Sequence, residues 1–132
     1  MPDSVVDASA LAAFVFQEAR AEEARHALAG QTLHAPHLLA YELTHIAQKK
    51  MLANPSGERT IAAMLDRGLS IGARLIEVDH RSTLELALLT GLSSYDAAYV
   101  RLARSLGVPL ITFDQRMRVV MDRLTQSDSS SC

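Results

Sequence analysis

Short apolar segments alternate with longer amphipathic segments along most of this 132-residue chain. The apolar segments have the length and composition of buried strands, and they cover residues 4–6, 32–35, 73–78 and 109–112. Strands that alternate with helices predict a parallel sheet, because a parallel neighbour is reached through a crossover connection such as a helix. We therefore expect an α/β fold in which helices cover both faces of a parallel sheet.

The predicted helices begin at capping residues or prolines and end at glycines or other turn signals. They cover residues 8–19, 21–29, 36–52, 58–67, 82–89, 93–106 and 114–124. The last segment, residues 125–132, is polar and rich in serine, so we expect a disordered tail. The sequence shows no internal repeat, and residues 1–124 are expected to form a single domain.

Composition limits the classes of function. The net charge of −2 provides no global basic field for nucleic acid, so any RNA contact must rest on a local basic patch or on metal ions. No apolar run approaches the ~20 residues that span a bilayer, and the first residues lack the basic and apolar parts of a signal peptide. The single cysteine, Cys132, has no intrachain partner. These features predict a cytoplasmic protein.

Four acidic residues stand among apolar neighbours, where an unpaired charge is costly to bury. They are Asp7, Glu42, Asp96 and Asp114. Asp7 and Asp114 directly follow predicted strands and Asp96 lies in the first turn of a predicted helix, so folding would gather them at the carboxyl edge of the sheet. A cluster of acids repels itself unless a cation lies between them. The pattern therefore predicts a divalent-metal site, which indicates an enzyme.

Each acid also has an ordinary structural explanation. Asp7 and Asp114 would serve as helix caps, and Asp96 would interact favourably with a helix dipole. Glu42 interrupts the apolar face of its predicted helix, where it would pair with a histidine or a lysine of the same helix. Capping leaves Glu42 unexplained, and this favours the shared metal site.

Four sequence features form a recognisable set: residues 5–9 (VVDAS), the mid-helix Glu42, residues 92–103 (LSSYDAAYVRLA) and residues 108–114 (VPLITFD). Together they resemble the PIN domain family, and most closely its small single-domain VapC-type ribonuclease toxins. The resemblance implies a PIN-like three-layer α/β/α fold with a parallel sheet of four or five strands. It also implies RNA cleavage that depends on Mg²⁺ or Mn²⁺, a homodimer, and a cognate antitoxin protein as partner.

The resemblance also implies roles for individual residues. It places the acidic site on Asp7, Glu42, Asp96 and Asp114 and the supporting hydrogen bonds on Ser9 and Thr112. We expect the three aspartates to bind the metal, with Asp114 binding directly or through water, and Glu42 to act as a ligand or as a water-orienting base. Lys49 and Arg116 are candidates for contacts to RNA phosphate, and the alternative for both is a solvated surface cation.

Two features depart from the family pattern. The residues after Glu42 are Leu43-Thr44-His45, where the family often has a small or amide residue at the third place. The family usually has a further short strand after its last helix, whereas residues 116–124 lead directly into the polar tail. The sheet is therefore expected to have four strands, or five if residues 119–121 leave the predicted helix.

Other functions remain to be compared. A phosphoryl-accepting receiver domain needs adjacent acids after its first strand, and a haloacid-dehalogenase-type phosphatase needs two aspartates two residues apart. Here Asp7 stands alone and Ser9 occupies the second place after it. A housekeeping RNA-processing PIN nuclease and a non-catalytic PIN-fold protein-binding module both remain open. A pure scaffold has no need to hold repelling charges together, which argues against the second.

Overall fold

The structure is a computed structural model that describes residues 2–130. Its sheet has four parallel strands in the order β3-β2-β1-β4. The strands are β1 (Asp3–Val6), β2 (Thr32–Pro36), β3 (Arg74–Ile76) and β4 (Leu110–Ile111). In the register of the sheet, Val5 of β1 is opposite His34 on one side and Leu110 on the other. Val5 and Val6 are fully buried, as expected for a central strand that is covered on both faces.

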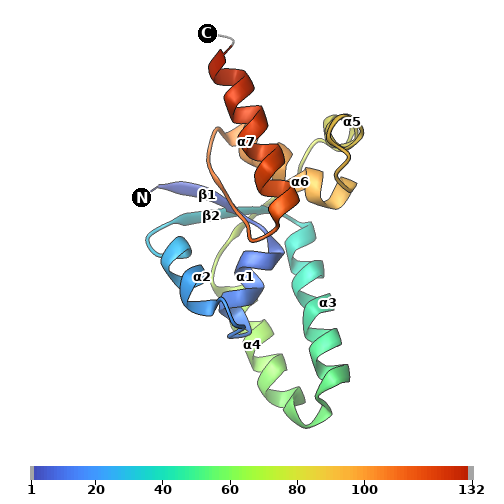
Figure 1. Ribbon diagram of the computed structural model, residues 1–132. Helices are drawn as coiled ribbons and strands as arrows, with labels where there is room; N and C mark the ends of the chain where they lie inside the picture. The colour runs from blue at the N-terminus through green and yellow to red at the C-terminus, as the bar shows by residue number, and fades with distance from the viewer. Residues whose placement is uncertain (1, 131–132) are drawn as a thin grey trace.

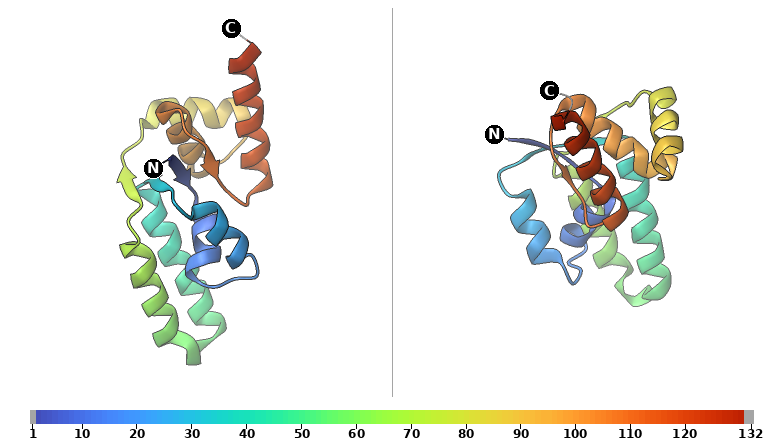
Figure 2. Two further views of the ribbon diagram at one scale, coloured as in Figure 1. Left: turned by 90° about the vertical axis from the view of Figure 1, so that its left-hand side faces the viewer. Right: turned by 45° about the horizontal axis from the view of Figure 1, so that its top comes forward.

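Helices cover both faces of this sheet (Figures 1 and 2). One face carries α1 (Ala8–Val15), α2 (Ala21–Leu28), α3 (Leu38–Ala53) and α4 (Glu58–Ser70), with a short 3-10 turn, η1 (Pro55–Gly57), between the last two. The other face carries α5 (His80–Thr90), α6 (Ser94–Leu106) and α7 (Gln115–Ser130). The hairpin of α3 and α4 extends away from the sheet on one side, and α7 extends on the other. This three-layer α/β/α arrangement confirms the predicted fold class.

One close helix contact sets the position of α4 against α1. A Cβ atom added at Gly68 of α4 would lie 2.8 Å from both Cγ atoms of Val15 at the end of α1. Glycine therefore permits an approach that any other residue would obstruct. Because β3 follows α4 after a short turn, this packing also helps to place the edge strand of the sheet.

The carboxyl-terminal segment differs from its predicted form. α7 continues past residue 124 to Ser130, so the structure has a helix over residues 125–130, where the sequence predicts a disordered tail. Arg104 of α6 forms an ion pair with Asp128 at 2.9 Å, which attaches the end of α7 to the neighbouring helix. Residues 119–121 lie inside α7, and the described residues form four strands rather than five. Cys132 lies outside the described residues.

Several predicted boundaries also shift. The first helix ends at Val15 rather than at residue 19, because Gln17 adopts a left-handed conformation with φ of 52°. Pro36 closes β2 instead of opening the next helix, which begins at Leu38. The segment predicted as a strand over residues 73–78 narrows to Arg74–Ile76. Among the described residues, no helix combines the length and the apolar character needed to cross a membrane.

Candidate active site

Asp7 is the most deeply buried acid of the site, with 3% of its surface exposed. It follows β1 directly and caps α1, because its Oδ1 accepts a hydrogen bond from the Ala10 amide at 3.0 Å. Ser9 Oγ donates to the same oxygen at 2.8 Å, and Thr112 Oγ1 donates to Oδ2 at 2.5 Å. The carboxylate is therefore held by donors from the start of α1 and from the segment after β4.

The segment after β4 is held to Asp7 by two shared hydroxyl groups. Thr112 Oγ1, which donates to Asp7, accepts a hydrogen bond from the Asp114 amide at 2.9 Å. Ser9 Oγ, which also donates to Asp7, accepts one from the Phe113 amide at 3.0 Å. Both hydroxyls thus act as donor and acceptor at once. They fix the backbone that carries Asp114 beside the carboxylate of Asp7.

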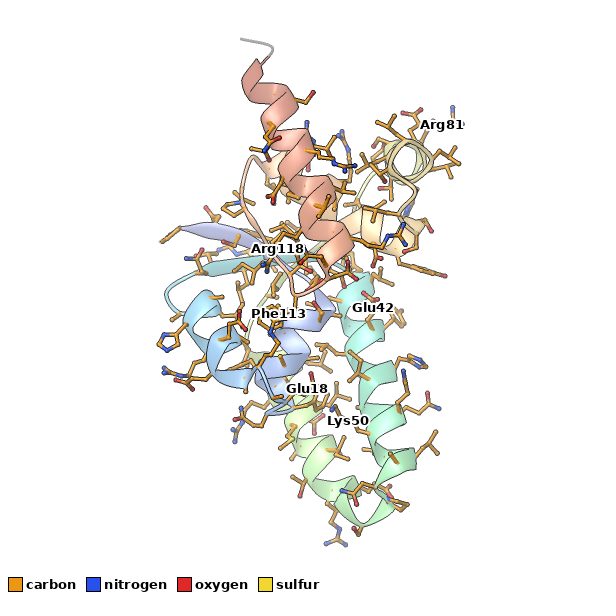
Figure 3. All side chains as sticks on the ribbon, viewed as in Figure 1. Glu18, Glu42, Lys50, Arg81, Phe113 and Arg118 are labelled. Atoms are coloured by element: carbon orange, nitrogen blue, oxygen red, sulfur yellow. The ribbon has the colours of Figure 1, made fainter. Side chains whose placement is uncertain are left out.

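Two arginines contact the same segment from outside, and one of them, Arg118, is labelled with Phe113 in Figure 3. Arg118 of α7 donates to the carbonyl oxygen of Thr112 at 2.6 Å. The guanidinium of Arg20 lies 3.8 Å from the centroid of the Phe113 ring, within the range of a cation–π contact. These contacts tie residues 112–114 to α7 and to the connection between α1 and α2.

Glu42 reaches the site from the first half of α3. Its Oε1 accepts a hydrogen bond from the Tyr99 hydroxyl at 2.5 Å, across a sequence separation of 57 residues. Tyr99 belongs to α6 and is 1% exposed, so its ring is part of the core between the sheet and that helix. The partner of Glu42 is therefore a buried tyrosine and not the histidine or lysine of its own helix.

Asp96 lies in the first turn of α6, and Asp114 directly precedes α7. Ser93 caps α6 and accepts a hydrogen bond from the Asp96 amide at 3.0 Å. Asp114 precedes α7, and its Oδ1 accepts a hydrogen bond from the Met117 amide at 2.9 Å. The capping roles expected for Asp7 and Asp114 therefore exist, and they coexist with a position beside the other acids.

The acids influence one another electrostatically. Burial raises the pKa of Asp7 and the charge of Asp114 adds to this, while hydrogen bonds from Thr112, Ala10 and Ser9 act in the opposite direction. Burial likewise raises the pKa of Asp96, with a further contribution from Asp114.

Glu42 completes this electrostatic group. Burial raises its pKa, the Tyr99 hydrogen bond opposes the rise, and the charges of Asp96 and Asp7 add to it. Burial, followed by the bond to Glu42, raises the pKa of Tyr99 itself, so the tyrosine stays protonated and donates. Folding has thus brought four acids, separated by up to 107 positions in the sequence, into a single group at the carboxyl edge of the sheet.

The donor set of this group fits a hard divalent cation. It offers carboxylate oxygens supported by hydroxyl groups, and oxygen is the ligand atom that Mg²⁺ and Mn²⁺ favour. Among residues 2–130, no three acidic, histidine or cysteine side chains are arranged tightly enough to form a complete cage. Mg²⁺ retains several water molecules and binds through one or two carboxylates, so it needs no such cage. One or two of the predicted ligands Asp7, Asp96 and Asp114 could therefore hold it.

The basic candidates differ in their relation to the acids. Arg116 of α7 donates to the carbonyl of Gly91 at 2.9 Å, and its charge lowers the pKa of Asp96 against the larger effect of burial. Arg116 therefore borders the acidic group. Lys49 is exposed further along α3 and does not take part in the hydrogen bonds of that group.

Tyr99 is the site residue that sequence reasoning missed. It lies three residues after Asp96, which places both on one side of α6. A general signal existed, because a tyrosine expected in a core needs a hydrogen-bond partner for its hydroxyl. No local pattern selects Glu42 as that partner.

This chain is similar in sequence to a known domain family and to named proteins. The sequence pattern of the PIN domain matches residues 4–122. Ribonuclease VapC3 of Pyrobaculum aerophilum is 36% identical over 118 residues, which cover 86% of this chain and 90% of that protein. Ribonuclease VapC1 of Mycobacterium tuberculosis is 33% identical over 125 residues, covering 89% and 90%.

A solved structure agrees with these sequence relatives. The crystal structure of PAE2754 from Pyrobaculum aerophilum superposes with a TM-score of 0.74 and 27% sequence identity, over 90% of this chain and 86% of that one. The agreement therefore extends over most of both chains. The chain belongs to the PIN domain family.

Proposed function

We propose that this protein is a metal-dependent ribonuclease, using Mg²⁺ or Mn²⁺, and that it is the toxin of a toxin–antitoxin pair. The observation that carries the proposal is the group of four acids at the carboxyl edge of the sheet in a PIN domain. The names of the relatives, which are VapC ribonucleases, support RNA as the substrate. We expect the protein to act in the cytoplasm.

Different residues of the site would have different roles in the reaction. Asp7, Asp96 and Asp114 would hold the cation, with Ser9 and Thr112 fixing the oxygens of Asp7. When bound, such an ion polarises a phosphodiester and lowers the pKa of a bound water.

Glu42 would act as a metal ligand or as the base that orients an attacking water and receives its proton. Its Oε1 is occupied by Tyr99, which leaves Oε2 as the acceptor. Its raised pKa brings this carboxylate closer to the range in which a base works well near neutral pH. Arg116, at the border of the acidic group, would contact an RNA phosphate. Lys49 is a second candidate that lies further away on α3.

A homodimer is supported by exposed apolar side chains next to the acidic group. Tyr41 of α3, Leu84 and Leu88 of α5 and Tyr95 of α6 are 75%, 55%, 78% and 62% exposed. Large exposed apolar side chains form the kind of surface that an interface between two protein chains buries. A second copy would cover this surface. Light scattering should show a dimer that the double variant Leu84→Glu, Leu88→Glu converts to a monomer.

Expression in a bacterial host tests the toxin role. Wild-type protein should arrest growth and degrade cellular RNA, whereas Asp96→Asn should do neither at an equal protein level. Glu58→Gln, an exposed change at the start of α4, serves as the control and should remain toxic. Co-expression of a small antitoxin gene adjacent to this one should restore growth.

The outcomes separate the three candidate functions. A wild-type protein that cleaves RNA in vitro but is harmless at high expression would indicate a housekeeping RNA-processing nuclease. A protein that neither cleaves RNA nor arrests growth would indicate a non-catalytic binding module.

A further inference from the structure

Phe113 stands in the chain between Thr112, which donates to Asp7, and Asp114, an expected metal ligand. The Phe113 amide donates to Ser9 Oγ at 3.0 Å, so its backbone is part of the acidic site. Its ring is only partly buried and packs against the edge of the core. Because the carboxylate of Asp114 moves with this backbone, whatever holds the ring of Phe113 also helps to hold Asp114.

Arg20 holds the ring from the start of α2. The centre of its guanidinium lies 3.8 Å from the centroid of the Phe113 ring. The same guanidinium is bound at two points by Glu23, from Nε to Oε2 at 2.8 Å and from Nη2 to Oε1 at 3.0 Å. The two side chains are 47% and 57% exposed, but a bidentate pair is the geometry in which an exposed ion pair still contributes. The cation over Phe113 is therefore kept in a defined place.

Arg118 of α7 closes this arrangement from the other side. Its amide donates to the Asp114 carbonyl oxygen at 3.1 Å, and its guanidinium donates to the Thr112 carbonyl oxygen at 2.6 Å. The hydrogen bond from Arg20 lowers the pKa of Glu23, and the charge of Arg118 acts in the same direction, so Glu23 lies near both guanidinium groups. Residues 112–114 are thus held by α2 as well as by α7.

Arg25 shows what sets Arg20 apart. It also belongs to α2, and it also pairs with a glutamate three residues away, Glu22, with side chains that are 54% and 70% exposed. The hydrogen bonds described for the Arg25 side chain all go to that glutamate. An ion pair of this kind is ordinary on a helix surface. The ring contact to Phe113 is the feature that connects Arg20 to the acidic site.

We propose that Arg20, held by Glu23, is a positioning residue that fixes Phe113 and, through it, Asp114, and so raises the affinity of the acidic site for a divalent cation. Groups that orient metal ligands commonly affect metal affinity without touching the ion. The inference rests on the proposed function, because it concerns the metal site of that reaction. Loss of Arg20 leaves all four acids in the chain, so the site should be weakened and not abolished.

Binding of Mn²⁺ to the full chain, without RNA, tests the proposal. Electron paramagnetic resonance measures free Mn²⁺, and therefore gives the Kd independently of cleavage. Arg20→Ala should raise this Kd by about threefold to tenfold, because it releases the ring of Phe113. Arg25→Ala is the matched control and should leave the Kd unchanged, since it removes the same kind of ion pair from the same helix.

A double-mutant cycle determines whether Arg20 acts through Phe113. Phe113→Leu keeps an apolar side chain and the backbone hydrogen bond to Ser9, but it removes the ring. It should raise the Kd of Mn²⁺ to a similar extent. Arg20→Ala combined with Phe113→Leu should add little to either single change, because both remove the same contact. Circular dichroism confirms that each variant is folded.

Cleavage of RNA provides a second measurement. The Arg20→Ala protein should cut more slowly than the wild type when Mn²⁺ is limiting, and at nearly the wild-type rate when Mn²⁺ is saturating. Its KM for RNA should be unchanged, because the guanidinium of Arg20 is already engaged by Glu23 and Phe113.

Three results would overturn the inference. The first is a Kd for Mn²⁺ that Arg20→Ala changes no more than Arg25→Ala does, and the second is full additivity in the double-mutant cycle. The third is a cleavage defect with a raised KM that saturating Mn²⁺ does not restore, which would make Arg20 a contact to RNA. Failure of the proposed function is distinguishable, because it would appear as absent cleavage in the wild-type protein. A wild-type protein that binds no Mn²⁺ would contradict both.

Discussion

Replacing Tyr99 with phenylalanine isolates the hydrogen bond that holds Glu42. The ring of Tyr99 is 1% exposed and its hydroxyl donates to Glu42 Oε1 at 2.5 Å. Phenylalanine keeps the ring and its packing, so the substitution creates no large cavity. The only substantial change is the loss of one donor to a carboxylate.

The expected loss of stability follows from that bond. A hydrogen bond to a charged group contributes about 1.5–3 kcal/mol. Glu42 is only half-buried, so water can replace part of what is lost. We expect Tyr99→Phe to lower the free energy of unfolding by about 1–2 kcal/mol when Glu42 is ionised.

The effect should depend on pH in a definite direction. Burial raises the pKa of Glu42 above its ordinary value of 4.5, and the Tyr99 hydrogen bond opposes this rise. A carboxyl group with a raised pKa contributes stability below its unfolded value, and this contribution is lost as the pH rises through its folded value. Tyr99→Phe raises the pKa of Glu42 further, so its deficit should be largest at alkaline pH and smaller near pH 4.5.

Urea denaturation in chelator, at about pH 8 and at the lowest pH where the protein stays folded, measures this difference. Tyr95→Phe is the matched control, because Tyr95 is 62% exposed on the same helix and should change little at either pH. Equal deficits for Tyr99→Phe at both pH values, or no deficit at all, would refute the role assigned to the hydrogen bond.

Substitutions at three further positions test the acidic group and its support. In chelator, Asp96→Asn should raise the free energy of unfolding by about 1 kcal/mol, because it removes repulsion with Asp114. Asp7→Asn should lower it instead, because an amide NH₂ in place of Oδ2 would face the hydroxyl of Thr112, which already donates its proton there. Urea unfolding of both variants measures these opposite changes in the free energy of unfolding. Stabilisation by Asp7→Asn would contradict the hydrogen-bond arrangement. Thr112→Val should cost about 1–3 kcal/mol in the same assay, because it removes the donor to Asp7 and the acceptor for the Asp114 amide. Thr112→Ser keeps both groups and should retain most of the stability, so an equal loss in the two variants would count against this role.

The sequence predicted the parts of the site that depend on local pattern. Asp7 and Asp114 follow apolar strands, and the carboxyl ends of parallel strands share one edge of a sheet. Glu42 is predicted as a site residue because a helix cap does not explain a carboxylate on an otherwise apolar helix face. In the structure these acids do lie near enough to affect one another's pKa.

The features that the sequence did not predict depend on contacts between distant segments. The bond from Tyr99 to Glu42 joins α6 to α3, and no local pattern reports it. The length of α7 is a second feature that the sequence did not predict, because a polar serine-rich segment has little intrinsic tendency to form a helix. The ion pair between Arg104 and Asp128 supplies the tertiary support that local composition lacks.

The rate of RNA cleavage as a function of added Mg²⁺ tests the central claim most directly. The protein is first treated with chelator, and the titration compares the wild type with Asp96→Asn, using Glu58→Gln as the control. We predict no cleavage without the metal, saturable recovery in the wild type and the control, and at most residual cleavage by Asp96→Asn. Cleavage that persists in chelator, or an Asp96→Asn protein that cuts RNA at the wild-type rate, would contradict a metal-dependent ribonuclease site built on these four acids.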